Sequence, residues 1–175
     1  RRALAAEAAT QTALSAAKAI YTNLQPIKPE CLHRAYNKML DGVDAVTMAD
    51  VTCYRNFLID IDRKGVKGIS ATDAEKAEID DARQAIKEFL MHDLGWPDPA
   101  FDANSGNGGH DNWRIDLAPT KENQELLKHC YLALNQKFGS DTLSIDASLA
   151  DPNQLIKLYG TKTRKGDNTK ERPHR

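Results

Sequence analysis

From residue 54 onward, strand-like and helix-like hydrophobic patterns follow one another in a fixed order. The run YRNFLIDID at 54–62 is aromatic and β-branched and closes with alternating Ile and Asp, which predicts a strand. Thr72 and Glu75 have the spacing of a capping box, and Gly95 marks the end of the helix that they begin. A strand followed by a long helix is therefore expected here.

The residues after this helix repeat the alternation with two strands in place of one. Short strands are expected at 100–104 and 110–117, because a glycine-rich turn joins two runs of strand character. Thr120 caps a second helix, whose leucines recur at helical spacing until Gly139. A brief strand at 143–146 completes the order β-α-β-β-α-β.

This order is that of the ferredoxin-like split unit, which RNA-recognition modules (RRMs) and polymerase palms also use, so the expected fold class is α+β. Right-handed crossovers make the first two strands parallel, which brings the turn after the second strand to the edge where the first strand ends. The fourth strand runs antiparallel to the first and reaches that edge too. Asp60, Asp62, the turn at 105–110 and Asp146 are therefore predicted to converge.

The residues before this unit predict an N-terminal helical or αβ extension. An Ala-rich helix is expected at 3–19 and a second helix at 30–40, with a short extended piece at 20–27 between them. The chain is thus divided into a subdomain at 1–53 and an RRM-like core with a basic C-terminal segment at 54–175.

Composition excludes several classes of protein. Ten Gly and seven Pro in 175 residues are too few for a collagen-like or largely disordered chain. The longest apolar runs, such as 57–59, are far shorter than the roughly 18 residues of a membrane-spanning helix, so no membrane partner is expected. Three widely spaced cysteines favour a reducing compartment, and we expect a cytoplasmic location. The chain starts without Met and is expected to be a piece of a longer protein.

Basic residues are concentrated near the C-terminus. Residues 157–175 contain seven Lys or Arg and two acidic residues, although the whole chain has a formal charge of −1. A basic segment on an acidic body indicates a polyanion bound at one place. A solvated, frayed terminus remains the alternative interpretation.

Two aspartates at the end of the first predicted strand are candidate metal ligands. Asp60 and Asp62 are two residues apart, so their side chains leave one face of the strand roughly 6 to 7 Å apart. Carboxylate oxygens suit Mg²⁺ or Mn²⁺, and Asp146 would complete a site for two ions and phosphoryl transfer. The alternative is that these are strand-end acids that simply face water.

A turn rich in glycine supplies candidate phosphate-binding groups. In SGNGGH at 105–110, the three glycines allow backbone amides to approach an anion, and Ser105 and His110 can donate to phosphate oxygens. A hairpin turn with a surface histidine is the alternative. Lys157, Arg164 and Lys165 follow the last carboxylate closely enough to return to the same site.

Together these motifs resemble the archaeo-eukaryotic primase superfamily, especially the bifunctional primase-polymerases of mobile elements and CRISPR-associated proteins. The resemblance covers residues 20–175. It rests on IDID at 59–62, SGNGGH at 105–110, ID at 145–146, KLYGT at 157–161, RKGDNT at 164–169 and RPHR at 172–175.

The resemblance implies a DNA primase or polymerase that adds nucleotides to a primer or initiating nucleotide on a DNA template. Two Mg²⁺ or Mn²⁺ ions would be held by Asp60, Asp62 and Asp146. The implied nucleotide-binding residues are Asn37, Ser105, His110, Lys157 and Lys165. The implied nucleic-acid-binding residues are Arg164 and Arg172. The implied partners are a template and primer, nucleoside triphosphates, and helicase or nuclease domains.

The chain also departs from the pattern of the family at three positions. Family members often have Asn in place of Gln25, an apolar residue in place of Asp111 and Arg in place of Gln154. These differences motivate an alternative function, a non-catalytic module that binds nucleotide or single-stranded nucleic acid. A third hypothesis is a metal-dependent nuclease, which shares the carboxylates but has no use for a triphosphate-binding turn.

Overall fold

The computed structural model describes residues 17–36, 40–65 and 67–175. Within these residues the fold is α+β, with two antiparallel sheets and two α-helices. The Ala-rich helix expected at 3–19 lies almost entirely outside the described residues.

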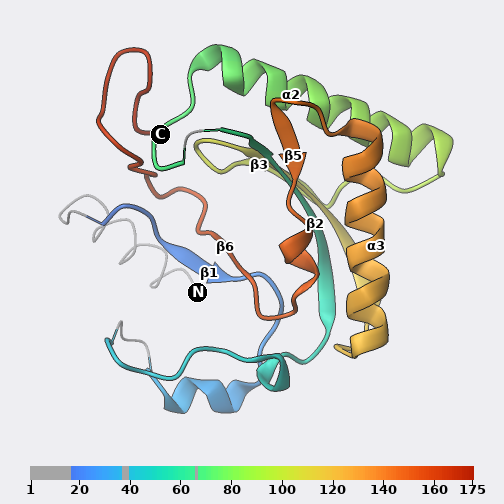
Figure 1. Cartoon of the computed structure of the whole chain (residues 1–175). Helices are drawn as coiled ribbons and strands as arrows, with labels where there is room; N and C mark the ends of the chain where they lie inside the picture. The colour runs from blue at the N-terminus through green and yellow to red at the C-terminus, as the bar shows by residue number, and fades with distance from the viewer. Residues whose placement is uncertain (1–16, 37–39, 66) are drawn as a thin grey trace.

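The larger sheet has four strands, and each matches a strand predicted from the sequence. Its order is β3-β4-β2-β5, and every neighbouring pair is antiparallel (Figure 1). The strands are β2 (Tyr54–Arg63), β3 (Phe101–Asn104), β4 (Gly109–Leu117) and β5 (Leu143–Ile145). The two long strands, β2 and β4, therefore occupy the centre of the sheet.

Helix α2 (Asp73–Glu88) begins at the predicted capping box. The Thr72 hydroxyl accepts from the backbone N–H of Glu75 at 3.1 Å, and the Glu75 carboxylate accepts from the Thr72 N–H at 2.7 Å. The helix continues through a π turn, η3 (Phe89–Asp93), and stops before Gly95, whose φ of 69° is in the left-handed region. Both ends of this helix agree with the sequence signals.

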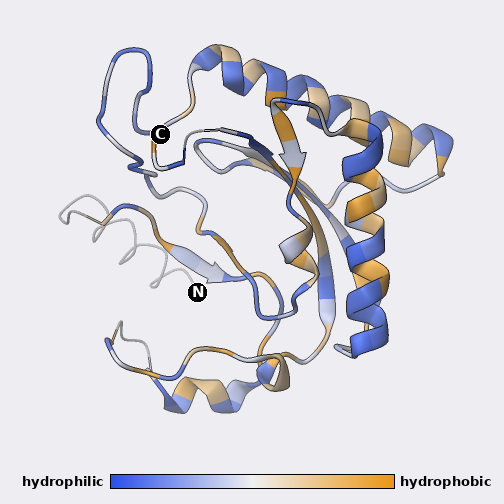
Figure 2. Cartoon of the chain, viewed as in Figure 1, coloured by the Kyte–Doolittle hydropathy of each residue, from blue (hydrophilic) through white to orange (hydrophobic). Residues whose placement is uncertain are grey.

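Helix α3 (Lys121–Phe138) is also bounded by the residues expected to bound it. Thr120 accepts at its N-terminus from the backbone N–H of Asn123 at 3.3 Å, and Gly139 follows its last turn. In Figure 2 hydrophobic and hydrophilic stretches alternate along α2 and α3, as expected for helices with one face against a sheet.

Strand alternation gives β2 two chemically different faces. Phe57 projects toward the helices and stacks on Tyr131 of α3 with 4.8 Å between ring centroids, and Ile59 and Ile61 share its face. Burying each such side chain contributes about 1.5–3 kcal/mol. Asp60 and Asp62 project from the opposite face, away from the helices.

A two-stranded sheet lies across from that opposite face (Figure 1). It pairs β1 (Tyr21–Asn23) with β6 (Leu155–Lys157), and Tyr21 is directly opposite Lys157. Between β5 and β6 runs a 3₁₀ turn, η4 (Ala147–Ala150). The extended piece predicted near residue 20 is thus a strand whose partner is far along the chain.

The helix predicted at 30–40 is wrong for the part of this range that the structure describes. The chain forms only a 3₁₀ turn, η1 (Pro29–His33), and a second one, η2 (Met48–Asp50). Neither turn has a buried residue, so an α-helix here would have no apolar face to pack. The segment is held instead by the Arg34–Asp50 ion pair at 2.9 Å.

Among the described residues, no helix combines the length and apolar character that crossing a lipid bilayer requires.

Candidate functional site

A pocket of about 200 Å³ lies between the acidic face of β2 and the small sheet of β1 and β6. Its walls come from β1, β2, the turn before β4, the end of β5 and the segment around β6 and beyond, so five parts of the sequence meet in it. The described lining residues are Tyr21, Asp60, Asp62, Ser105, Asn107, His110, Asp146, Leu149, Gln154, Leu155, Ile156, Lys157, Thr163 and Lys165.

The three predicted carboxylates lie on one wall of this pocket. Asp60 is paired directly with His110 across the β2–β4 ladder. On its other side, the backbone N–H of Asp146 donates to the Asp60 carbonyl at 3.1 Å, which continues the β2–β5 ladder by one residue. Asp62 follows on the same face of β2. The structure therefore brings together the aspartates that strand geometry predicted to converge.

Crowding of these acids shows in the charge state of Asp62. Although its side chain reaches solvent at the pocket mouth, surrounding protein withdraws water from the carboxylate, and the charges of Asp60 and Asp146 add repulsion. Together these effects raise the pKa of Asp62 to about 6, against an opposing effect of Lys165. A cation among the carboxylates would relieve this repulsion.

The turn at 105–110 is held firmly against the carboxylates. The Ser105 hydroxyl accepts from the Gly108 N–H at 3.0 Å, and buried Lys76 of α2 donates to the Gly108 carbonyl at 3.1 Å. A Cβ at Gly108 would stand 2.9 Å from Asp62 Oδ1, and Gly106 has a φ of 100°. Glycine is required at both positions, one for close approach and one for backbone conformation.

His110 connects the carboxylates to Tyr159, a residue of the KLYGT motif to which the sequence patterns gave no role of its own. Its Nε2 lies 3.1 Å from Asp60 Oδ1, and its Nδ1 lies 2.6 Å from the Tyr159 hydroxyl. A carboxylate beside Nε2 favours a proton on that nitrogen, which leaves Nδ1 to accept from the tyrosine. Burial raises the pKa of Tyr159, so its hydroxyl keeps the proton that it donates.

Two buried polar groups that line the pocket have no partner among the described residues. Lys157 is only 6% exposed, and within the described residues its Nζ has no hydrogen-bond partner. Burial lowers the pKa of this ammonium. The amide Nδ2 of Asn107 is also buried and unpartnered among those residues, while its Oδ1 accepts from the Ala71 N–H at 2.7 Å. Unpaired buried donors are costly, and an anion would satisfy both.

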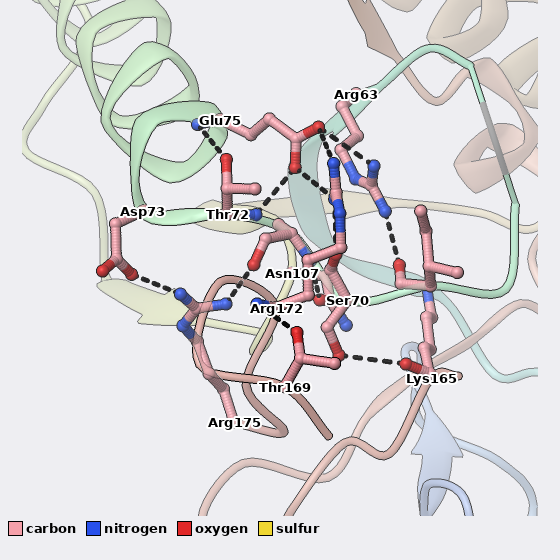
Figure 3. A network of polar contacts seen from close by, with 12 residues as sticks. Arg63, Ser70, Thr72, Asp73, Glu75, Asn107, Lys165, Thr169, Arg172 and Arg175 are labelled. Atoms are coloured by element: carbon pink, nitrogen blue, oxygen red, sulfur yellow. Dashed lines mark hydrogen bonds and ion pairs between the residues drawn. The ribbon is translucent and has the colours of Figure 1, made fainter. Parts of the chain in front are cut away.

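Of the remaining predicted residues, Asn37 lies outside the described residues, and Arg164 and Arg172 do not line this pocket. The backbone N–H of Arg164 donates to Lys18 at 2.6 Å, beside the start of β1. Arg172 forms two hydrogen bonds with Glu75, at 2.8 and 3.1 Å, and one with the Ser70 carbonyl at 2.7 Å (Figure 3). Nucleic-acid contacts by Arg164 and Arg172 stay predictions, and the Arg172 guanidinium is already bound to its own protein.

Two of the three residues that depart from the family pattern, Gln25 and Asp111, form hydrogen bonds within the protein. Buried Gln25 bonds to the backbone of Arg55 and Asn56 and so ties the N-terminal segment to β2. Asp111 is 2% exposed, on the helix side of β4, where Arg83 of α2 binds it at 2.8 and 3.1 Å.

The third departure, Gln154, does line the pocket, where a longer basic side chain would add positive charge.

Carboxylate oxygens are the ligands that Mg²⁺ and Mn²⁺ prefer, but the aspartates that line this pocket do not form a ready-made metal site. In the described part of the chain, no three His, Cys, Asp or Glu side chains are grouped so as to hold a metal ion. Mg²⁺ commonly takes one or two carboxylates and completes its shell with water and substrate phosphates. Asp60 Oδ1 is buried 3.1 Å from His110 Nε2 but accepts no well-aligned hydrogen bond from a described residue, so it can also contact a cation.

Three residues had no role in the sequence predictions because mainly tertiary contacts reveal them: Asn107 and Thr163, which line the pocket, and Tyr159, which lies behind His110. Tyr159 is recognisable only through its bond to His110, and Thr163 only through its bond to the Ser105 carbonyl at 3.0 Å. Asn107 had a weak signal, because it stands inside the glycine-rich turn. No pattern distinguishes it there from an ordinary turn residue.

Comparison with known proteins leaves the resemblance to the primase superfamily a prediction. No family model, no curated protein and no solved structure matches this chain.

Proposed function

We propose that the pocket binds a nucleoside triphosphate and that the chain uses it to extend a nucleic-acid strand by nucleotidyl transfer, as primase-polymerases do. One observation carries the proposal. A single pocket is lined by three carboxylates and also by Lys165, Ser105, His110 and a buried lysine, Lys157, that has no hydrogen-bond partner among the described residues. This is a complementary environment for a polyphosphate with bound divalent cations.

The size and rim of the pocket agree with this ligand. Its volume of about 200 Å³ is below the roughly 300–1,000 Å³ of sites that enclose a whole drug-sized ligand, so it suits the phosphate end of a nucleotide. Tyr21 and Leu155, 53% and 54% exposed, stand at its edge. Exposed apolar side chains beside an anion site provide a surface for a nucleobase.

Each polar residue then has a chemical role. Lys157, Lys165, Ser105 and the Nε2–H of His110 would bind the phosphates, and Tyr159 would hold the His110 ring in orientation. Asp60, Asp62 and Asp146 would hold divalent cations. When bound, these cations neutralise phosphate charge and lower the pKa of the attacking hydroxyl.

In the reaction, the 3′-oxygen of the acceptor forms a bond to the α-phosphorus. The bond from that phosphorus to pyrophosphate breaks, and the hydroxyl proton passes to solvent.

The fold supports the same proposal. The elements β2-α2-β3-β4-α3-β5 follow the order of the ferredoxin-like split unit, with the carboxylates on the face that the helices leave uncovered. We propose that this unit is the catalytic core of a primase-polymerase, with the N-terminal segment closing its nucleotide pocket.

A labelled primer on a template, incubated with Mn²⁺ and nucleotides, tests the proposal. We expect longer products from the native chain, none from Asp60→Ala, and native yields from Asp98→Ala, a control at an exposed position. Shortened strands would indicate a nuclease. An unchanged primer with native protein, or equal extension by Asp60→Ala, would reject nucleotidyl transfer.

The second candidate, binding without turnover, is favoured by the lack of a ready-made three-ligand metal group among the described residues. It predicts triphosphate affinity that persists after chelation of divalent cations. Nucleotidyl transfer predicts that chelation weakens binding and stops extension.

A further inference from the structure

A second cavity, of about 530 Å³, adjoins the nucleotide pocket. Four residues line both: Asp62, Asn107, Asp146 and Lys165. The rest of its wall comes from the loop after β2 and the end of β5, namely Arg63, Lys64, Gly65, Lys67, Gly68, Ile69, Ser144, Ile145 and Ala147. Asp62 and Asp146 therefore lie between the nucleotide pocket and the second cavity.

The outer wall of the second cavity is basic. Lys64 and Lys67 are both exposed, and the Lys64 ammonium is anchored by one hydrogen bond to the Ser140 carbonyl at 2.6 Å. Arg63 has a structural role, because its guanidinium binds Glu75 at 3.2 Å and also the Ile69 carbonyl. The cavity thus combines exposed positive charge at its rim with hydrogen-bonded protein behind it.

The loop backbone is open to an approaching ligand. Gly65 and Gly68 have φ values of 113° and 82°, and a Cβ at either would meet no atom within 4 Å. Glycines in the left-handed region occur in backbone nests, whose N–H groups bind anionic oxygens. At Gly65 and Gly68 no side chain stands in the way of a chain of phosphates that approaches the two lysines.

The chemistry of transfer decides what belongs in this space. Attacking and leaving oxygens lie roughly in line on opposite sides of the reacting phosphorus. With the leaving phosphates against Ser105, His110 and Lys157, the acceptor must approach past Asp62 and Asp146 from the other side. That side is the second cavity.

We infer that the second cavity receives the 3′ end of a single-stranded nucleic acid, with Lys64 and Lys67 on its phosphates. This inference rests on the proposed nucleotidyl transfer. It moves strand binding away from the C-terminal arginines, because Arg172 and Arg175 bind Glu75 and Asp73 at the start of α2 (Figure 3).

The experiment compares a Lys64→Gln/Lys67→Gln variant with a Lys121→Gln/Lys128→Gln variant, which removes equal charge from exposed positions of α3. Binding of a 5′-fluorescein oligodeoxynucleotide of about 12 nucleotides is followed by anisotropy in roughly 50 to 200 mM salt. Loss of two phosphate contacts should lower the slope of log affinity against log salt by about 1.4 and weaken binding on the order of tenfold. The control should keep the native slope.

A fluorescent triphosphate, titrated in the presence of Mn²⁺, separates this inference from the function on which it rests. Native triphosphate affinity in the Lys64→Gln/Lys67→Gln variant, with weakened oligonucleotide binding, supports the cavity assignment. Oligonucleotide binding equal to that of the control overturns the assignment alone. Failure of the native chain to bind the triphosphate overturns the proposed function instead.

A photocrosslink gives a second readout that does not depend on affinity. An oligonucleotide with 4-thiothymidine at its 3′ end should label peptides that contain residues 63–69. Labelling confined to residues 161–175 would overturn the inference.

Discussion

Two clusters of charge in this protein are organised in opposite ways. At the start of α2, Glu75 accepts from Arg172, Arg63 and the Thr72 N–H, and the Arg172 hydrogen bonds lower the pKa of this carboxylate to about 2. In the pocket, the pKa of Asp62 is raised to about 6 and that of Lys157 is lowered. The paired charges around Glu75 stabilise the fold. The perturbed charges of the pocket are of the kind found at functional sites, where a bound ligand can stabilise them.

The largest effect that separates the clusters is expected at Lys157. Replacing it with Met removes an unpaired buried charge, so the free energy of unfolding should stay the same or increase. Triphosphate affinity should fall about 10- to 100-fold, because a charge-assisted bond contributes roughly 1.5–3 kcal/mol. Titration with a fluorescent triphosphate and thermal unfolding measure the two effects, with Lys128→Met as the control. If Lys157→Met lowered the free energy of unfolding by as much as it weakened triphosphate binding, Lys157 would be a stabilising residue like those around Glu75.

The opposite behaviour is expected for Arg172→Met, which should lower the free energy of unfolding, because it removes the hydrogen bonds that Glu75 accepts from Arg172. The Tm should fall by a few degrees. Because the folded pKa of Glu75 is depressed, its contribution is full above about pH 5 and is lost as the pH falls toward 2.

The difference in Tm between native protein and Arg172→Met should therefore shrink in acid. Lys170→Met, at an exposed position, is the matched control. A difference that is the same at pH 3 and pH 7 would show that Glu75 is not the partner responsible.

Tyr159→Phe sharpens the comparison inside the pocket by removing one hydrogen bond and keeping the ring. We expect triphosphate affinity to fall about 3- to 10-fold, the value of one such bond. The ¹⁵N shift of His110 Nδ1 should change because that nitrogen loses its hydrogen-bond donor, whereas Asp60 keeps the proton on Nε2, and loss of packing alone would not produce this local change. Tyr36→Phe, at an exposed tyrosine, should leave both measurements unchanged.

The smallest effect is expected for Asp62→Asn. The raised pKa of Asp62 means that its ionised form opposes folding above about pH 6, so the variant should gain stability at pH 8. Screening by solvent limits the gain to under about 1 kcal/mol. The gain should vanish near pH 4, where the native side chain is protonated. If Asp62→Asn were less stable than the native protein at pH 8, the ionised Asp62 carboxylate would not be destabilising in the folded state.

The sequence allowed prediction of those features that local chemistry determines. Thr72 and Thr120 start helices because their hydroxyls cap backbone N–H groups, and Asp60 and Asp62 share a face because strand side chains alternate. The convergence of Asp146 with them followed from antiparallel pairing in a short connection order. These inferences needed only the period of each element and the handedness of its connections.

The features that could not be predicted depend on contacts between distant residues. Nothing in the sequence near Tyr159 indicates that it contacts His110, and nothing near Arg172 indicates that it binds Glu75. The segment around Pro29 has helix-forming residues but no surface to bury them on, and burial decided its conformation. Charge in the sequence does not say whether its partner is internal.

Because β1 pairs with β6, the last strand of the chain, the part of the pocket that contains Lys157 is synthesised late. A nascent chain that has emerged only as far as β5 would hold the acidic strands but lack Lys157 and its partner strand contact with Tyr21. On the proposed function, such an intermediate would lack the buried lysine that contacts the phosphates. Nucleotide binding would then begin only after β6 has paired with β1.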